Sequence, residues 1–246
     1  AFTEHDQHQV GEKWVSCDVA RGSGRSMKDG DLLQKYKDRF GASWVDVKEE
    51  GKGSVRVKPL SEYRHLVEVP GQFLVITGEE VTTTWGGDKD VSRMHWINVF
   101  NTPEAVEPQH DFESSERAMQ ATLRATRSLG LSSGADVLVF LNHPNFAWNA
   151  TAESIAAVED LRHIEIYTAL NMCNTFGDES HCSAERIWDV ALTLRLKEGG
   201  DLIYGLATDD CHTYAHHWEL GDTALPGRAW VCVQADGLTP EHILGA

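Results

Sequence analysis

The 246-residue sequence lacks most of the features that identify common functional classes. No apolar run reaches the roughly 18 residues that a membrane-spanning helix needs. Basic residues are few, 22 against 38 acidic ones, and the formal charge of −16 argues against a nucleic-acid partner, because a phosphate backbone is bound by basic surfaces. The phosphate-cradling patterns GxGxxG and GxxxxGK[ST] are absent, and no GxSxG elbow joins a predicted strand to a helix.

The cysteines argue against a small protein stabilised by a framework of disulfides. There are five, they form no CxxC pair, and an odd number makes a disulfide framework improbable. The sequence leaves room for one disulfide bridge, for instance between Cys173 and Cys182. It does not identify the cellular compartment. The 41% hydrophobic and 24% charged residues are typical of a soluble globular protein, and we expect one domain over residues 1–246.

Short apolar runs alternate with helical patterns along the chain. The runs are β-rich and nearly continuous in apolar character, which predicts buried strands at 73–77, 94–100, 137–141, 164–167, 203–207 and 229–233. Helices are expected at 116–129, ending at Gly130, and at 184–198, with Ser183 as N-cap; a short one opens at Thr239-Pro240. Strands that alternate with helices predict an α/β fold with a largely parallel sheet, either open or closed into a barrel.

Side chains that can bind metal ions follow several of these strands. In parallel α/β folds the loops at the carboxyl ends of the strands converge, and sites are built there. One candidate, His95, lies instead at the start of its strand. Ligands of these types suit Zn²⁺, Mn²⁺ or Fe rather than a soft thiolate site. The six candidate ligands are His5, Glu80, His95, His143, Asp210 and His212.

Other roles can be assigned to some of these residues and their neighbours. The Asp-x-His spacing lets Asp210 and His212 reach one centre, and Asp210 or a neighbouring histidine could relay a proton in catalysis. Glu80 could bridge two ions. Glu165 is either a residue that supports a metal ligand or an ordinary buried carboxylate. Arg228 either contacts an anionic substrate or forms a structural ion pair.

Motifs along nearly the whole chain resemble those of the polymerase and histidinol phosphatase (PHP) superfamily. AFTEHDQ resembles its "TDHN" segment, ITGEEVTT its "G-x-E" motif with the ligand at Glu80, and MHWINVF the following His-bearing strand. LNHPNFAW resembles the "HP" motif, HIEIYT the "EvyN" segment, and YGLATDDCHTY the pattern "G-x-a-(S/T)-D-D-x-H". The ending PGRAWVCVQADGLTPEHIL is similar to the closing strand and helix of the carbaryl-hydrolase-like subgroup.

This resemblance implies a distorted TIM-like barrel of about seven β/α units that holds two or three divalent ions, usually Zn, Mn or Fe. Glu80, His95 and His143 would form one centre, and Glu80 would bridge to a second that uses Asp210. His5 and His212 would serve the third. The implied activity is hydrolysis of a phosphoester, or of a carboxylic or carbamic ester, by metal-activated water, on a small substrate that is either anionic or neutral.

One departure from the family pattern concerns its opening strand, which carries "HxH". No such motif precedes Ala1, and AFT resembles the end of a buried strand, so we expect a fragment that lacks the first strand of the barrel. A catalytically inactive metal-binding or structural module is then the alternative function. An amidohydrolase-type barrel also opens with HxH, but its carboxylated lysine has no counterpart here.

Overall fold

The computed structural model describes residues 2–6, 11–17, 32–51, 53–87, 90–212 and 225–246. The chain forms two compact units, one of His8–Val67 and the other of Ala1–Gln7 together with Glu68–Ala246. The single domain expected over residues 1–246 stays a prediction. Within the described ranges, no helix has the length and apolar character that crossing a membrane requires.

The smaller unit contains a three-stranded antiparallel sheet and two helices. Its strands lie in the order β2 (Lys13–Ser16), β4 (Ser54–Val57) and β3 (Val47–Lys48), and its helices are α1 (Leu32–Phe40) and α2 (Leu60–Val67). Cys17, Val45 and Val55 form a small buried core. Arg56 donates hydrogen bonds to Asp46 and Glu62, which connects β4 to α2. None of the candidate ligands belongs to this unit.

The larger unit is built on a seven-stranded sheet in the order β1-β5-β6-β8-β9-β10, with β7 pairing β5 outside this path. Four pairings are parallel (β1/β5, β5/β7, β8/β9, β9/β10), whereas β5/β6 and β6/β8 are antiparallel. The expected α/β class with a largely parallel sheet is therefore confirmed. The strands are β1 (Phe2–His5), β5 (Thr77–Trp85), β6 (Met94–Phe100), β7 (Gln109–Phe112), β8 (Leu138–Leu141), β9 (His163–Thr168) and β10 (Tyr204–Thr208).

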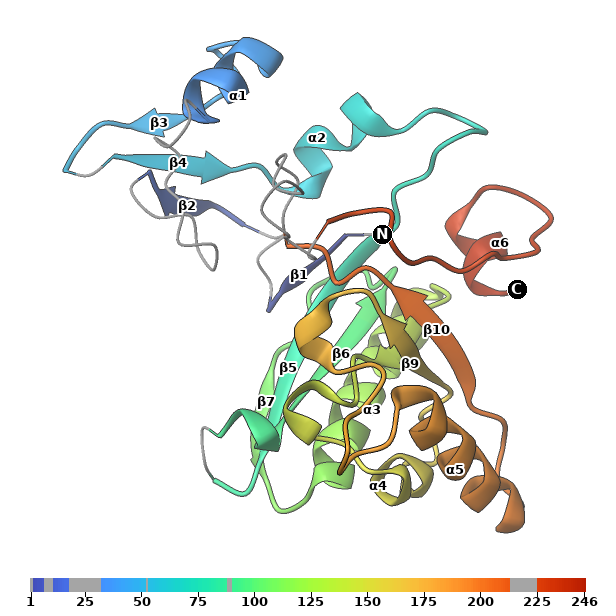
Figure 1. The fold of residues 1–246 in the computed structure, drawn as a ribbon. Helices are drawn as coiled ribbons and strands as arrows, with labels where there is room; N and C mark the ends of the chain where they lie inside the picture. Colours follow the sequence, from blue (N-terminus) through green and yellow to red (C-terminus); the bar gives the residue numbers. More distant parts are fainter. Residues whose placement is uncertain (1, 7–10, 18–31, 52, 88–89, 213–224) are drawn as a thin grey trace. The chain divides into compact units, whose positions relative to one another are not determined.

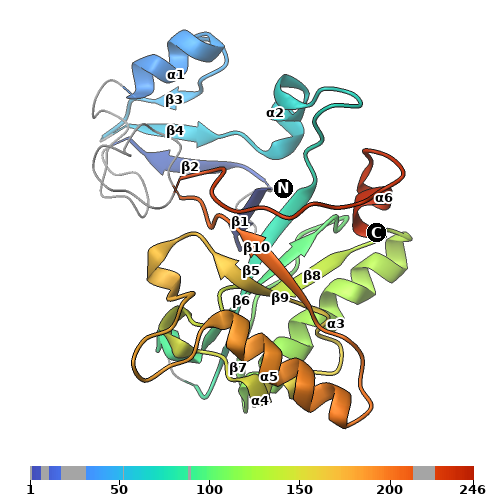
Figure 2. The same ribbon diagram turned by 45° about the vertical axis from the view of Figure 1, so that its right-hand side comes forward.

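Three helices, α3 (Ser115–Ser133), α4 (Ala152–Ala157) and α5 (Ala184–Lys197), pack on one face of this sheet (Figures 1 and 2). Ser183 caps α5 as the sequence predicts, and Thr239 caps the short α6 (Pro240–Leu244) with Pro240 in its first turn. The described part of the unit also contains the short 3-10 turns η2 (Val91–Arg93), η3 (Phe146–Trp148) and η4 (Asn171–Cys173). Figure 1 shows η4 in the loop that follows β9.

The alternation of side chains along the strands separates an apolar face from a polar one. Val81, Ile97 and Ile164 belong to the core that the helices cover. Because successive strand residues point to opposite faces, the neighbours Glu80, Asn98 and Glu165 point away from the helices. All three are buried polar groups, at 6% exposure or less. The candidate chemistry therefore lies on the face of the sheet opposite the helices.

The sheet is strongly curved. β1 and β10 stand at the two ends of the strand order, yet the ring of His5 at the end of β1 lies 6.2 Å from that of His212, which follows β10. Between these two strands the described residues form no pairing, so the sheet is not closed into a barrel there. The curvature brings the carboxyl ends of β1 and β10 to the same place.

Two predicted strands are wrong. Phe73 lies in a turn closed on Val69 and is 53% exposed, and the strand begins only at Thr77. The run at 229–233 forms no strand, since the Ala229 amide donates to the Asp209 side chain and Trp230 is 68% exposed. An apolar run forms a strand only where a neighbouring strand accepts its backbone hydrogen bonds.

The end of the first predicted helix is also wrong. α3 continues through Gly130 and ends at Gly134, which adopts the left-handed conformation, with φ 70°, that favours glycine in this position. A β-carbon at Gly130 would lie only 2.9 Å from a methyl carbon of Val137 and 3.1 Å from the Ala135 carbonyl oxygen, closer than packed atoms normally approach. Gly130 therefore serves packing rather than helix termination.

Arg195 of α5 connects this helix to α4, and its replacement gives a prediction about stability. The side chain is 4% exposed and donates to the backbone carbonyls of Ala156, Leu161, Ile155 and Val158. Arg195→Met would leave these buried acceptors unsatisfied. We expect the free energy of unfolding in urea to fall by about 3 kcal/mol or more.

The control is the same substitution at an exposed position of the same helix. Arg186 lies 3.6 Å from Asp189 in an exposed ion pair, which contributes under about 1 kcal/mol. Arg186→Met should therefore change stability little. Equal losses for the two variants would show that the carbonyl contacts of Arg195 do not stabilise the fold.

Candidate metal centre

The carboxylate of Glu80 lies between two histidines. The parallel register of β1 and β5 places His5 directly opposite Glu80, and His5 Nδ1 lies 2.7 Å from Glu80 Oε2. On the other side, His143 Nε2 lies 3.6 Å from Glu80 Oε1, to which Asn142 also donates a hydrogen bond. Each oxygen of Glu80 therefore faces a different imidazole, as a carboxylate that bridges two cations would.

These contacts shift the protonation of all three groups. Burial alone would raise the pKa of Glu80, but His143 and His5 outweigh it and lower the pKa to about 2. Burial would likewise lower the pKa of His143, whereas the Glu80, Glu165 and Asp210 carboxylates raise it to about 9. The contact with Glu80 raises the pKa of His5. A cation that replaces these protons would keep the buried charge of Glu80 compensated.

A second group of possible ligands adjoins His143. One ligand atom each of His143, Cys173 and Asp210 lies within 4.8 Å of the other two. The Cys173 thiol donates to Asp210 Oδ2 over 3.3 Å, and burial together with Asp210 raises the pKa of this thiol. Asp210 adopts a left-handed backbone with φ 49°, a conformation that Asp tolerates better than most residues.

Cys173 was not among the sequence-predicted ligands. It lies in the loop after β9, at the carboxyl end of a strand of the parallel sheet, where His143 and Asp210 also lie. The positional rule that selected those two residues therefore applied to Cys173 as well. It was missed because only His, Asp and Glu side chains were considered.

His212 lies on the solvent-exposed side of the group formed by His143, Cys173 and Asp210. Its Nδ1 is 2.9 Å from the Asp210 carbonyl oxygen and 3.5 Å from Asp210 Oδ1, and its side chain is about half exposed. With His5 close by, His212 and His5 form a pair that is open to solvent. The structure thus brings together five of the six predicted ligands: His5, Glu80, His143, Asp210 and His212.

His95 is the exception. In the antiparallel pairing of β5 and β6 it stands opposite Thr83, on the helix-covered face, whereas Glu80 lies on the other. Its ring stacks on Trp85 at 4.3 Å, and its Nε2 lies 2.8 Å from Ser115 Oγ. The expectation that His95 shares a centre with Glu80 and His143 is therefore not met, because strand alternation turns its side chain away.

The same alternation distinguishes Glu79 from Glu80. Glu79 Oε2 accepts a hydrogen bond from the Val106 amide, and Val106 belongs to the core on the helix side. Glu80 is the carboxylate of this pair that reaches the histidines. The sequence-based choice of Glu80 over Glu79 thus agrees with the side-chain directions.

Glu165 holds the loops around the site in place. Its carboxylate accepts hydrogen bonds from the His143 amide at 2.7 Å, from Thr168 Oγ1 at 2.9 Å and from Thr208 Oγ1 at 2.6 Å. Burial raises its pKa, although the charge of His143 and these three donors oppose the shift. Glu165 joins the ends of β8, β9 and β10, and so orients His143.

Arg228 lies close to this edge through its backbone. The amides of Gly227, Arg228 and Ala229 all donate to the Asp209 carboxylate at 2.6 Å. Asp209 directly precedes Asp210, so the segment that carries Arg228 is held beside the candidate ligands. Its suggested role toward an anionic substrate stays a prediction.

Buried polar atoms without partners indicate that the group suits a cation. Among the described residues, His143 Nδ1, Asn98 Oδ1 and Asn142 Oδ1 are buried and have no hydrogen-bond partner. Asn98 stands opposite Glu80 in the sheet, and Asn142 adjoins His143. Leaving such groups unpaired is costly, and imidazole, carboxylate and thiol are ligand types of borderline divalent ions. The residues present therefore fit a divalent transition metal.

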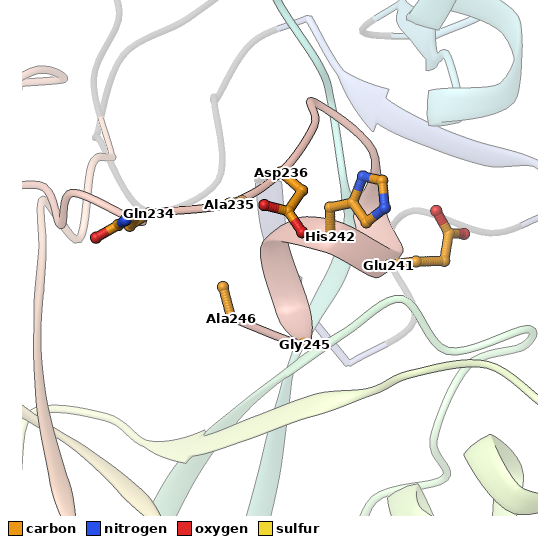
Figure 3. A pocket seen from close by; sticks show the side chains of 7 residues that line it. All are labelled: Gln234, Ala235, Asp236, Glu241, His242, Gly245 and Ala246. Atoms are coloured by element: carbon orange, nitrogen blue, oxygen red, sulfur yellow. The ribbon is translucent and has the colours of Figure 1, made fainter.

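Among the described residues of the larger unit, other features do not form a comparable site. A pocket at the C-terminal helix is lined by Gln234, Ala235, Asp236, Glu241, His242, Gly245 and Ala246, none of them a candidate ligand (Figure 3). The string GLSSG at 130–134 fits the pattern GxSxG but lies at the end of α3, not between a strand and a helix. Cys173 and Cys182 are both free thiols, so they are not bridged to each other.

Comparisons of the chain with protein-family models, with curated proteins and with solved structures find no match. The resemblance to the PHP superfamily thus rests on the motifs quoted above.

The buried position of His95 predicts a pH effect on stability. Burial, with the nearby His143, lowers its pKa to about 3. The unfolded chain binds a proton at His95 below the ordinary value of 6.5, whereas the folded chain does not. Stability is therefore lost as pH falls from about 6.5 toward 3, and His95 should account for about 2–3 kcal/mol of that loss at pH 4.5.

His95→Phe, which keeps a ring against Trp85, should lose less stability between pH 7 and pH 4.5 than the unsubstituted chain. Urea unfolding at the two pH values measures the difference. Parallel pH dependences would contradict the buried neutral state of His95.

Proposed function

We propose that this protein is a metal-dependent hydrolase of the PHP type that acts on a phosphoester or on a carboxylic or carbamic ester. The observation that carries the proposal is Glu80, whose two carboxylate oxygens face His5 and His143 from opposite sides. Asp210 and His212 lie next to these histidines. We also propose that the fold is a PHP-like barrel, and the curved, mostly parallel sheet supports this.

Each carboxylate oxygen of Glu80 defines one proposed metal position. His143 and Asp210 would hold one divalent ion together with Glu80 Oε1, and His5 and His212 would hold another with Glu80 Oε2. Bound ions of this kind polarise the scissile bond and make water a nucleophile near neutral pH. The suitable ions are Zn, Mn or Fe, because the ligands are mainly imidazole and carboxylate.

The chain's own residues would orient the substrate and move protons. Asp210 is 18% exposed in its side chain and lies beside His212, so this pair can pass a proton between the site and solvent. The rings of Trp96 and Phe146 lie 5.5 Å and 5.3 Å from that of His143 and exclude water from one side of it. Arg228 is the proposed contact for an anionic substrate group.

The test combines metal analysis with activity. The purified protein is analysed for bound transition metals and assayed on p-nitrophenyl phosphate and on p-nitrophenyl carboxylic esters, with and without added Zn²⁺, Mn²⁺ or Fe²⁺. We expect bound metal, metal-dependent turnover and loss of both after chelation. His143→Ala should lower the metal content far more than His110→Ala, because His110 contacts Thr84, on the part of β5 away from Glu80.

The results separate the two candidate functions. Bound metal without turnover on any ester would favour an inactive metal-binding module. No bound metal and no turnover after metal addition would refute the hydrolase. Equal metal losses for His143→Ala and His110→Ala would refute the assigned ligands.

A further inference from the structure

We propose that Cys173 is a thiolate ligand of the ion held by His143 and Asp210, and that it makes this centre selective for Zn²⁺ or Fe²⁺ over Mn²⁺ and Mg²⁺. The inference rests on the proposed function, because it adds a ligand to the same site. It concerns a sulfur atom, whereas the ligands expected from the sequence are all nitrogen or oxygen donors.

The spacing of the three groups fits one ion. Zn²⁺ binds sulfur at about 2.3 Å and nitrogen or oxygen at about 2.0–2.2 Å, so neighbouring ligand atoms in a tetrahedral site lie roughly 3.5 Å apart. Cys173 Sγ and Asp210 Oδ2 are 3.3 Å apart, and the three ligand atoms all lie within 4.8 Å of one another. Together with Glu80 Oε1 these groups would supply four protein ligands, and water or substrate would enter as a fifth, as catalytic zinc sites that expand to five ligands allow.

Burial provides the second observation. Cys173 is 1% exposed and His143 is 7% exposed, and His143 Nδ1 has no hydrogen-bond partner among the described residues. A buried thiol and a buried imidazole that adjoin one carboxylate form a set of donors that a single bound ion could share.

The two loops that carry these side chains are fixed to each other. Asn145 Nδ2 donates to the Asn174 carbonyl, and Asn174 Nδ2 donates to the Asn145 carbonyl. Thr175 Oγ1 in turn donates to the Thr168 carbonyl at the end of β9 and accepts from the Thr168 amide. Because Asn145 and Asn174 lie next to His143 and Cys173 along the chain, these bonds preorganise the spacing of the two ligands.

Sulfur ligation has a chemical consequence. As the bond between Sγ and the ion forms, the thiol proton passes to solvent, and no atom is oxidised or reduced. Thiolates favour softer ions such as Zn²⁺, whereas Mn²⁺ and Mg²⁺ prefer oxygen ligands. Loss of the sulfur should therefore weaken Zn²⁺ binding much more than Mn²⁺ binding.

The test titrates the metal-free protein with Co²⁺ as a spectroscopic probe. Thiolate ligation gives a charge-transfer band in the near ultraviolet, separate from the visible bands of any bound Co²⁺. We expect both in the unsubstituted chain and in Cys182→Ser, whose thiol is exposed. Cys173→Ser should keep the visible bands, lose the near-ultraviolet band, and bind Zn²⁺ at least about 10-fold more weakly with little change for Mn²⁺.

X-ray absorption of the zinc-loaded, unsubstituted protein tests the same point without a variant that could misfold. A sulfur neighbour at about 2.3 Å supports the proposal, and a shell of nitrogen and oxygen alone overturns it. Visible Co²⁺ bands without the near-ultraviolet band, or a band that persists in Cys173→Ser, would also overturn it while leaving the hydrolase intact. The absence of any bound Co²⁺ and Zn²⁺ would refute both proposals.

Discussion

Replacement of Glu80 by glutamine is expected to lower the affinity for divalent metal by more than about 100-fold, since loss of a group that only supports a ligand already costs 10–100-fold. Glutamine keeps the shape of the side chain but removes the charge that both His5 and His143 face. A bridging carboxylate contributes to two ions at once, so occupancy of both should fall. Metal content after dialysis and a Zn²⁺ titration measure the effect.

Glu79→Gln is the matched control, because it makes the same change one residue away on the other face of β5. Glutamine at this position retains an oxygen that can accept the hydrogen bond from the Val106 amide. We expect metal affinity within a few-fold of the unsubstituted chain. Similar losses for the two variants would mean that the effect comes from the fold of β5 and not from ligation.

Asp210→Asn is expected to reduce kcat for p-nitrophenyl ester hydrolysis by about 10²–10⁴-fold. Two effects contribute: the amide cannot take up a proton at neutral pH, and it is a weaker ligand beside His143 and Cys173. Assays at saturating metal separate them. If full metal occupancy restores kcat, Asp210 acts as a ligand alone; if kcat stays low, it also moves a proton.

The control for this variant is Asp189→Asn. Asp189 lies on α5 in an exposed pair with Arg186, and its side chain takes no part in the site. Its kcat should match that of the unsubstituted chain. A kcat unchanged in Asp210→Asn as well would remove Asp210 from the proposed mechanism.

The candidate site was predictable from the sequence where a ligand directly follows a parallel strand. His143 after β8 and Asp210 after β10 were identified in this way, because the ends of parallel strands meet at one edge whatever the details of packing. His95 shows the limit of this reasoning. Whether a strand residue points to one face or the other depends on the register with its neighbour, and the Thr83–His95 pairing was not readable from the sequence.

The sequence by itself determined the α/β class, the helix cap at Ser183, the short helix that opens at Thr239-Pro240, and the placement of Asp210 and His212 after a strand. These features depend on local periodicity, on capping chemistry and on the order of strands. The tertiary structure alone decided that Phe73 and the run at 229–233 form no strands, that Glu165 joins three strand ends, and that Cys173 lies beside His143. Each of these depends on which distant segment supplies a hydrogen-bond partner or a neighbouring side chain, and local sequence patterns do not specify that partner.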